Sequence, residues 1–346
     1  MTIAGVSGRE WKNLPLQNQG IVMPKKDRLL LYLKEKRDSW ISGEMLSKEI
    51  GVSRSAVWKH IRRLKEDGYE ILSSPKKGYL LRKDSELLLP NEIREGLRTR
   101  VLGKRQIHYL REVDSTNLKA KLLAEKGASE GTVVVAEEQS AGRGRRGRRW
   151  FSSPGNGIYM SLILRPSISP IGAPRITLMT AVAVAEALLA EVDLDVRIKW
   201  PNDLLVRGRK LVGILTEINT EMDAVNYIVV GIGMNVNTPA EDFPEEIREI
   251  ATSIFRETGK RFSRIRLVKA CLEQFETYYE MFKENRFPAI IRRWKELARI
   301  VGQRITVDVL GKEYAGQVVE IDADGVLILR DDRGGIHRII SGDVTL

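Results

Sequence analysis

Apolar residues recur at helical spacing in three short segments near the start of the chain. The pattern predicts three helices, over residues 25–37, 43–49 and 54–66. Ser42 and Ser53 stand at the N-cap positions of the second and third helices. Gly51 directly follows the second helix, where a residue in the left-handed backbone conformation commonly ends a helix. Two short helices joined by the tight turn 50–53 form a helix-turn-helix arrangement.

The segment after the third helix predicts a β-hairpin. Residues 69–72 and 79–81 are expected to form strands around a turn that contains Lys76 and Lys77. Residues 25–84 carry 16 Lys/Arg and nine Asp/Glu, a net charge of +7, whereas the whole chain carries +11. This concentration of positive charge favours a polyanionic partner.

These features resemble the winged helix-turn-helix domain of bacterial and archaeal regulators, which implies DNA binding through the third helix and the wing. The side chains expected to meet DNA are Ser53, Arg54, Ser55, Trp58, Lys59, Lys76 and Lys77. The alternative is a small helical domain that docks on a protein and leaves its basic face in solvent. The clustered charge and the basic wing favour DNA.

Longer apolar segments dominate the middle of the chain. Residues 133–137 predict a buried strand, and 176–192 predict a buried helix that is too short to cross a bilayer. Cys271, the single cysteine, excludes an intramolecular disulfide and is expected to be buried in a helix over 265–282. One cysteine and three distant histidines also exclude a Cys/His metal cluster.

After Gly302 the hydrophobic period changes from that of a helix to that of strands. Five short strands, over 304–309, 314–322, 326–330, 336–340 and 343–346, predict a small barrel similar to SH3. The expected organisation is therefore a disordered tail (1–22), a DNA-binding domain (23–84), a central domain (85–300) and an SH3-like domain (301–346). The amino end shows no signal-peptide pattern, so we expect a cytoplasmic protein that does not associate with a membrane.

A second concentration of positive charge follows the strand predicted over 133–137. The loop 142–149 contains five arginines, no acidic residue and three glycines. Glycines let backbone N–H groups approach a ligand, and arginines offer forked donors to phosphate or carboxylate. An RNA-binding tract or a nuclear-import signal is the alternative. The loop follows a buried strand directly and is followed at once by Trp150, so it is enclosed in a folded domain, which argues against both alternatives. We expect it to be mobile without ligand and to close on an anion.

Further polar segments occur in the same domain. They are Asp-Ser-Thr-Asn at 114–117, Lys-Trp-Pro-Asn-Asp at 199–203, Lys-Leu-Val-Gly-Ile-Leu at 210–215 and Gly-Ile-Gly-Met-Asn-Val-Asn at 231–237. The last contains Gly-x-Gly, but no helix start follows it, so a dinucleotide-binding fingerprint does not apply.

Together with the arginine loop, these segments resemble the motifs of the biotin protein ligase family, in the domain order of the biotin operon repressor. The resemblance covers residues 25–346. It implies an α+β multidomain fold, in which a class II aminoacyl-tRNA-synthetase-like α/β catalytic domain lies between the winged helix-turn-helix and the SH3-like barrel. It also implies that biotin and ATP give biotinyl-5′-adenylate, from which biotin passes to a lysine of a biotin carboxyl carrier protein.

The resemblance assigns roles residue by residue. It implies that biotin is bound by Ser115, Thr116, Asn117, Gln139, Arg143, Gly144, Arg145 and Lys199. ATP or the adenylate would be bound by Arg145, Arg146, Trp150, Asn202, Asp203, Asn235 and Asn237. Lys199, with Arg143 and Arg145, is expected to be catalytic, because a fixed cation offsets the repulsion between a carboxylate and a phosphate. The alternatives are a plain helix cap for Ser115 and a surface lysine for Lys199.

The family also implies Mg²⁺, operator DNA as a partner, and a homodimer when the adenylate is bound, but the sequence identifies no metal ligands. The sequence leaves two candidates, solvent and Asp203, for the group that accepts the proton of the attacking carrier lysine. Two other functions stay open. One is a transcription factor with a non-catalytic biotin-binding sensor, which Lys199, Gln139 and the arginine loop argue against. The other is a ligase for a related acid such as lipoate. The arginine loop favours biotin over such an acid.

Overall fold

The computed structural model describes residues 23–221 and 224–345. It divides the chain into two compact units, with the division between Leu87 and Leu88. The tail expected at 1–22 lies outside the described residues.

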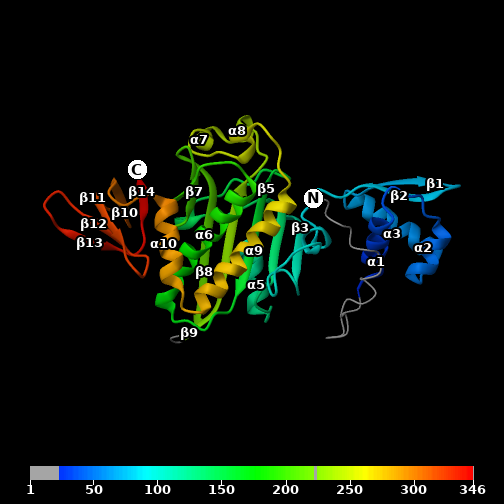
Figure 1. Ribbon diagram of the computed structural model, residues 1–346, viewed down its shortest axis with the longest axis horizontal. Helices are drawn as coiled ribbons and strands as arrows, with labels where there is room; N and C mark the ends of the chain where they lie inside the picture. The colour runs from blue at the N-terminus through cyan, green and yellow to red at the C-terminus, as the bar shows by residue number, and fades with distance from the viewer. Residues whose placement is uncertain (1–22, 222–223, 346) are drawn as a thin grey trace, which may run out of the picture. The chain divides into compact units, whose positions relative to one another are not determined.

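The first unit contains three helices and a hairpin (Figure 1). Its elements are α1 (Lys25–Glu35), α2 (Gly43–Ile50), α3 (Arg54–Glu66), β1 (Glu70–Ser74) and β2 (Gly78–Lys83). The hydroxyls of Ser42 and Ser53 accept hydrogen bonds from the first turns of α2 and α3, and Gly51 ends α2 at φ 67°. The predicted caps are thus confirmed. Leu33, Leu46 and Ile61 are among the buried residues that hold the three helices together.

A seven-stranded sheet is the centre of the second unit. In spatial order its strands are β3 (Ile107–Val113), β4 (Val133–Gln139), β5 (Gly157–Leu164), β9 (Ala224–Asn235), β8 (Arg209–Glu221), β7 (Asp203–Val206) and β6 (Val196–Lys199). β3 and β4 are parallel, and every other neighbouring pair is antiparallel.

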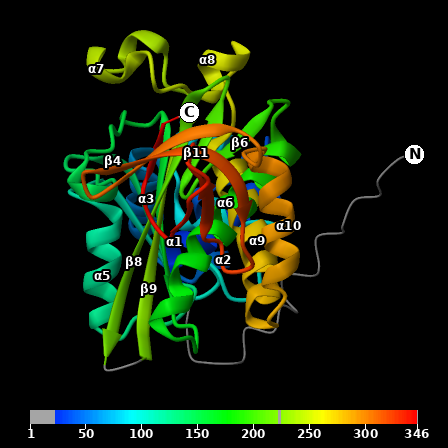
Figure 2. The same ribbon diagram turned by 90° about the vertical axis from the view of Figure 1, so that its left-hand side faces the viewer.

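Helices cover both faces of this sheet, because successive side chains of a strand point to opposite faces. Val133 and Val135 belong to the larger core, whereas Val134 packs in a smaller one beside α5 (Thr116–Glu125). Figure 2 shows α5 on one side of the sheet and α9 (Arg264–Lys283) and α10 (Phe287–Ala298) on the other.

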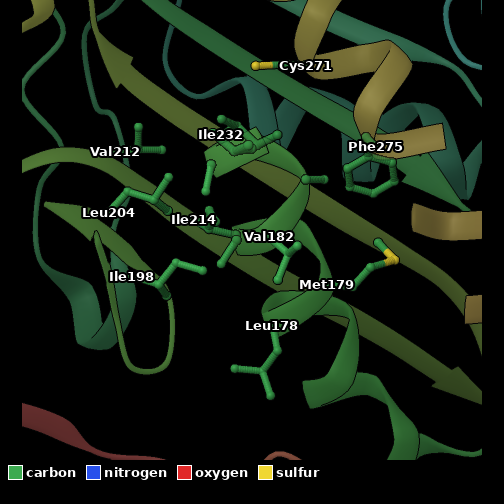
Figure 3. Packing of buried hydrophobic residues seen from close by; sticks show 14 of the residues in the cluster. Leu178, Met179, Val182, Ile198, Leu204, Val212, Ile214, Ile232, Cys271 and Phe275 are labelled. Atoms are coloured by element: carbon green, nitrogen blue, oxygen red, sulfur yellow. The ribbon is translucent and has the colours of Figure 1, made fainter. Parts of the chain in front are cut away.

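The larger core lies between the sheet and the helices α6, α9 and α10. Figure 3 shows Met179 and Val182 of α6 (Ala173–Glu191) facing the strand residues Ile214 and Ile232. Cys271 of α9 is buried in the same cluster, as predicted, and burial raises the pKa of its thiol to about 12. The thiol is therefore protonated and unreactive at neutral pH.

α6 is long and apolar enough to cross a bilayer by length and composition alone. However, 67% of its most apolar window is buried inside the fold, where it packs against α9, α10 and the sheet. The prediction of a buried helix is confirmed, and its apolar character is explained by these contacts with α9, α10 and the sheet.

The carboxyl end forms a five-stranded antiparallel sheet (Figure 1). Its spatial order is β13 (Ile336–Ile339), β12 (Leu327–Arg330), β11 (Lys312–Ile321), β10 (Arg304–Val309) and β14 (Asp343–Thr345). Ile305, Val307 and Val318 of this sheet belong to the same buried cluster as the residues beneath the seven-stranded sheet. The indole N–H of Trp200 donates to Gly325 O at 3.3 Å, which ties the turn after Lys199 to this sheet.

Candidate active site and DNA-binding surface

One pocket, of about 420 Å³, collects most of the predicted ligand-binding residues. It follows β8, whose residues Lys210, Gly213 and Leu215 line it in turn. Since a strand advances about 3.4 Å per residue, these residues span roughly 17 Å. The predicted residues that line the pocket are Ser115, Thr116, Asn117, Gln139, Arg143, Gly144, Arg145, Trp150, Lys199, Asn202, Asp203 and Asn235.

Short polar side chains at the start of α5 line one end of the pocket. Ser115 is the N-cap residue of α5, but its buried side chain makes no capping hydrogen bond, so the structure does not support the plain-cap interpretation. The backbone N–H and the hydroxyl of Thr116 donate to Gln139 Oε1 at 2.9 and 3.1 Å. The Gln139 amide in turn donates to Ser152 Oγ at 3.0 Å. This network fixes the side chains before a ligand arrives.

The Asn117 side chain is engaged within the protein. Its amide donates to Leu215 O at 3.2 Å and to Glu217 Oε2 at 2.9 Å, and its oxygen accepts from Ser161 Oγ at 2.6 Å. A Cβ atom added to Gly231 would lie 2.1 Å from that oxygen. Asn117 therefore joins α5 to three strands and requires a glycine at position 231.

Two more glycines explain how the middle of the pocket is built. Gly213 and Gly233 are paired across β8 and β9, and a Cβ atom on either would lie 2.6 Å from the Trp150 ring. The indole ring of Trp150 therefore packs directly against the backbone of Gly213 and Gly233. The Lys210 ammonium stands 5.5 Å from the ring centroid, within cation–π range. The indole N–H is buried and has no hydrogen-bond partner among the described residues.

Two lysines and a carboxylate line the pocket beside Gly213, where Asp203 is paired with Gly213 on one side and with Lys199 on the other. Lys210 Nζ lies 2.8 Å from Asp203 Oδ2, whereas Lys199 has no ion-pair partner in the part of the chain that the structure describes. Burial lowers the pKa of Lys199, with repulsion from Lys210 adding to the shift and attraction to Asp203 opposing it. A half-buried cation without a partner is suited to an anionic ligand. The surface-lysine interpretation of Lys199 does not fit its place in the pocket.

The arginine loop is held by the carboxyl-terminal sheet. Arg145 donates to Asn202 Oδ1 at 2.9 Å and to Ser341 Oγ at 2.7 Å. Arg148 forms an ion pair with Asp343 of β14. Arg143 pairs with Arg149 through a backbone bridge and leaves its own guanidinium exposed at the rim of the pocket. The loop thus places Arg143, Arg145 and Arg148 in the lining of the pocket.

Two of the predicted adenylate-binding residues do not line the pocket. The Arg146 guanidinium turns away to Asp308 and donates to its backbone oxygen at 3.0 Å. The Asn237 amide donates to Phe262 O at 2.9 Å, and its oxygen accepts from Phe262 N at 2.9 Å. Asn235 does line the pocket, but its amide donates to Thr252 O at 3.0 Å. These three side chains hold protein segments together.

The pocket also contains residues that the sequence analysis did not assign to a ligand. They are Arg148, Arg149, Phe151, Leu205, Gly208, Lys210, Gly213, Ile214, Leu215, Gly231, Ile232, Gly233, Phe243, Ile247, Ile250, Ala251 and Asp343. Lys210 and the glycines lie in motifs that the sequence displays, so the motif match could have identified them. Residues 243–251 and Asp343 carry no motif, and only the tertiary structure brings them to the pocket.

The outward face of α3 has the composition expected of a DNA-binding surface. The residues Arg54, Ser55, Trp58 and Lys59 are exposed, and the Trp58 side chain is 54% exposed although it is apolar. At the wing, Lys77 Nζ lies 5.8 Å from the centroid of the Trp40 ring. The cationic and aromatic side chains of this unit are therefore available to a partner.

The wing is fixed to the segment between α1 and α2. Ile41 and Tyr79 exchange two backbone hydrogen bonds, of 2.8 and 2.9 Å. Gly78 has φ 96°, and a Cβ atom there would lie 2.0 Å from Ile41 O. Only glycine combines this backbone conformation with so close an approach.

Comparison with known proteins gives the same domain order. Residues 25–80 match the model of an HTH domain, 109–235 that of the biotin/lipoate A/B protein ligase family, and 300–346 that of the biotin protein ligase carboxyl-terminal domain. The bifunctional ligase/repressor BirA of Bacillus subtilis strain 168 is 41% identical over 322 residues, which cover 93% of this chain and 98% of that protein. BirA of Escherichia coli K12 is 32% identical over 306 residues, which cover 88% of this chain and 92% of that protein.

This chain belongs to the bifunctional ligase/repressor family of biotin protein ligases. A solved structure supports the assignment: biotin protein ligase from Aquifex aeolicus in complex with biotin and ATP has a TM-score of 0.60 and 30% identity. The match covers 70% of this chain and 98% of that one. The family resemblance inferred from the motifs is thereby confirmed, and so are the expected fold class and the expected activity as a biotin ligase and repressor.

Proposed function

We propose that this biotin protein ligase performs two steps in the pocket along β8. Biotin and ATP first give biotinyl-5′-adenylate and pyrophosphate, and a lysine of a biotin carboxyl carrier protein then attacks the mixed anhydride. The observation that carries the proposal is that five separate motifs meet in one pocket, which polar side chains of α5 and the cationic side chains of Lys199 and Arg145 line together. We also propose that the protein works in the cytoplasm.

The two ends of the pocket fit the two substrates. The buried hydroxyls of Ser115 and Thr116 and the Gln139 amide suit the ureido ring of biotin, whose polar groups must be hydrogen-bonded when buried. Trp150 then bounds the middle of the pocket, next to the adenylate. Lys199, Arg143 and Arg145 would meet the biotin carboxylate and the phosphate that it attacks, where charge accumulates in the transition state.

Asn202 and Asp203 support this charged end. The Asn202 oxygen accepts from Arg145, and its amide donates to Ile214 O at 3.0 Å, so Asn202 holds the guanidinium against β8. Asp203 is the carboxylate near the reacting groups that could accept the proton of the acceptor lysine.

We propose that Mg²⁺ enters with ATP. The described residues contain no group of three metal-ligating side chains. Mg²⁺ keeps several waters and commonly takes only one or two carboxylates together with substrate phosphates. Asp203 and Asp343 line the pocket and fit this requirement. The ion would neutralise phosphate charge, while the arginines and Lys199 orient the phosphates.

The repressor activity is proposed to depend on the adenylate and on a homodimer. Beyond Gly213, β8 has no sheet neighbour on its outer side in the described part of the chain, because β7 pairs only with residues 209–213. Ile218 lies on this open strand and is 42% exposed. Strand edges of this kind pair readily with a second copy. A dimer would present two winged units to a two-fold symmetric operator.

DNA-binding anisotropy tests both activities together. With operator DNA from the region upstream of nearby biotin genes, we expect tight binding only when biotin and ATP are both present, and sedimentation should show dimers under the same conditions. That result would require adenylate synthesis as well as repression. Binding that is absent, or that is equal without ligands, would contradict the biotin-responsive repressor while leaving the ligase reaction in place.

The pH dependence of adenylate formation should reflect Lys199. Because burial lowers the pKa of this lysine from its ordinary 10.5, the cation is lost as pH rises through a value below 10.5. We therefore expect kcat/KM to fall on the alkaline side of the profile, since this parameter reports the free enzyme. The variant Lys199→Arg keeps its charge at high pH and should lose this alkaline limb. An unchanged limb in that variant would assign it to another group.

A further inference from the structure

Residues 238–253 form a loop with joined ends between β9 and α8 (Ile254–Thr258). The Ser253 hydroxyl donates to Thr238 O at 2.6 Å, and both residues are buried. Compact loops closed at their base are often functional. Phe243, Ile250 and Ala251 of this loop line the pocket.

The returning end of the loop lies against the lysine end of the pocket. The Lys210 backbone accepts from Thr252 N at 2.9 Å and donates to Ile250 O at 2.7 Å. The far end of the loop is held by a tilted ring contact between Phe243 and Phe151, with centroids 6.0 Å apart. The loop therefore forms a wall beside the residues proposed to bind the nucleotide.

A carboxylate behind this wall has no contact with the pocket. The Glu257 side chain is completely buried, with 0% exposed. Its Oε1 accepts from the Thr252 hydroxyl at 2.5 Å and from Arg209 Nη2 at 2.8 Å. One carboxylate oxygen thus joins the loop to the first residue of β8.

The second oxygen of this carboxylate accepts no hydrogen bond from the residues that the structure describes. Glu257 Oε2 and Arg209 Nε are both buried, and neither has a hydrogen-bond partner among the described residues. Arg207 Nη1 lies 3.6 Å from Oε2, beyond hydrogen-bond distance, and its side chain is 73% exposed. A buried, incompletely satisfied carboxylate is costly to the fold. Its compensating contribution is the anchoring of Thr252.

We propose that Glu257 is a positioning residue for the nucleotide. It acts through Thr252 to hold the loop 238–253 against Lys210. This inference rests on the proposed function for the identity of the ligand. A loop that is held closed only part of the time weakens apparent binding in proportion to the closed fraction. Loss of the anchor should therefore affect ATP more than biotin, whose proposed polar contacts lie near Leu215 and away from the loop.

Two variants test whether the hydrogen bond between Thr252 and Glu257 positions the loop or only contributes to the stability of the fold. Thr252→Val removes the hydroxyl donor and keeps the shape, and Glu257→Gln removes the charge that Arg209 faces. Glu273→Gln is the matched control, since Glu273 also pairs with an arginine (Arg98) and lies outside the pocket. Steady-state adenylate formation is measured with biotin and ATP varied separately. Amide hydrogen exchange over residues 243–252 is followed in the full chain without ligand.

We expect the KM for ATP to rise roughly threefold to tenfold in Thr252→Val, as for the loss of one hydrogen bond, and further in Glu257→Gln. The KM for biotin and kcat should stay within about twofold of wild type, and exchange over 243–252 should quicken in both variants but not in Glu273→Gln. An unchanged KM for ATP with unchanged exchange would overturn the inference. If wild type forms no adenylate, the proposed function fails, and the exchange data alone then decide whether Glu257 anchors the loop. If Glu257→Gln does not fold, Thr252→Val gives the decision.

Discussion

Replacing Lys199 by alanine is expected to slow biotinyl-adenylate formation by roughly 100-fold to 1,000-fold, the usual effect of removing one preorganised group from a charged transition state. Lys199 is half-buried at the end of β6, and Trp200 fixes the turn behind it by packing in the core. Its position is thus set by the fold and not by a flexible side chain in solvent. Pyrophosphate release in a single turnover measures the effect without the later transfer step.

The control for this prediction lies two residues earlier on the same strand. Arg197 is exposed, pairs with Asp195 and does not line the pocket, so Arg197→Ala should keep nearly full activity. Lys199→Arg should recover part of the lost rate, because it restores the charge with a different shape. Equal rates for Lys199→Ala and wild type would transfer the main electrostatic role to Lys210, the other lysine of the pocket.

Replacing Gly78 by alanine is expected to weaken operator binding by more than about 100-fold and to leave ligase activity within about twofold of wild type. An L-residue at φ 96° is strained, and the added methyl group would overlap the backbone oxygen of Ile41. The wing must then move away from the segment between α1 and α2. Anisotropy with biotin and ATP present, together with a biotin-transfer assay, measures the two activities on one preparation.

Gly51→Ala is the matched substitution within the same unit. Gly51 also has positive φ, at 67°, but the nearest atom to an added Cβ is the flexible end of Lys25, at 3.6 Å. It should therefore cost about 1 kcal/mol of backbone strain without displacing the wing. Similar losses of DNA affinity in both variants would show that general instability, and not the wing, governs binding.

Several contacts connect the carboxyl-terminal sheet to the active site. Arg145 meets Ser341, and Arg148 meets Asp343, while Trp200 donates to Gly325. The sheet therefore holds both the arginine loop and the turn that carries Lys199. This arrangement explains why the fold keeps a small β-domain next to a pocket that is otherwise built from one larger sheet.

Local rules were sufficient for most of the fold. The caps at Ser42 and Ser53, the helix that buries Cys271 and the strands after Gly302 follow from periodicity and turn chemistry, because these depend on neighbours in sequence. The motifs also indicated the correct family. The glycines at positions 213, 231 and 233 are visible in the sequence, but the reason why glycine is required there is not.

The sequence by itself determined the domain order, the family and twelve of the residues that line the pocket. Only the tertiary structure decided what each one does there. It placed Gly213 and Gly233 beneath Trp150, turned Arg146 and Asn237 toward protein partners, and brought Asp343 and the loop 238–253 to the pocket. The physical reason is that these roles depend on contacts between residues far apart in the chain. Spacing along a strand or helix carries no information about which distant backbone or carboxylate a side chain will meet.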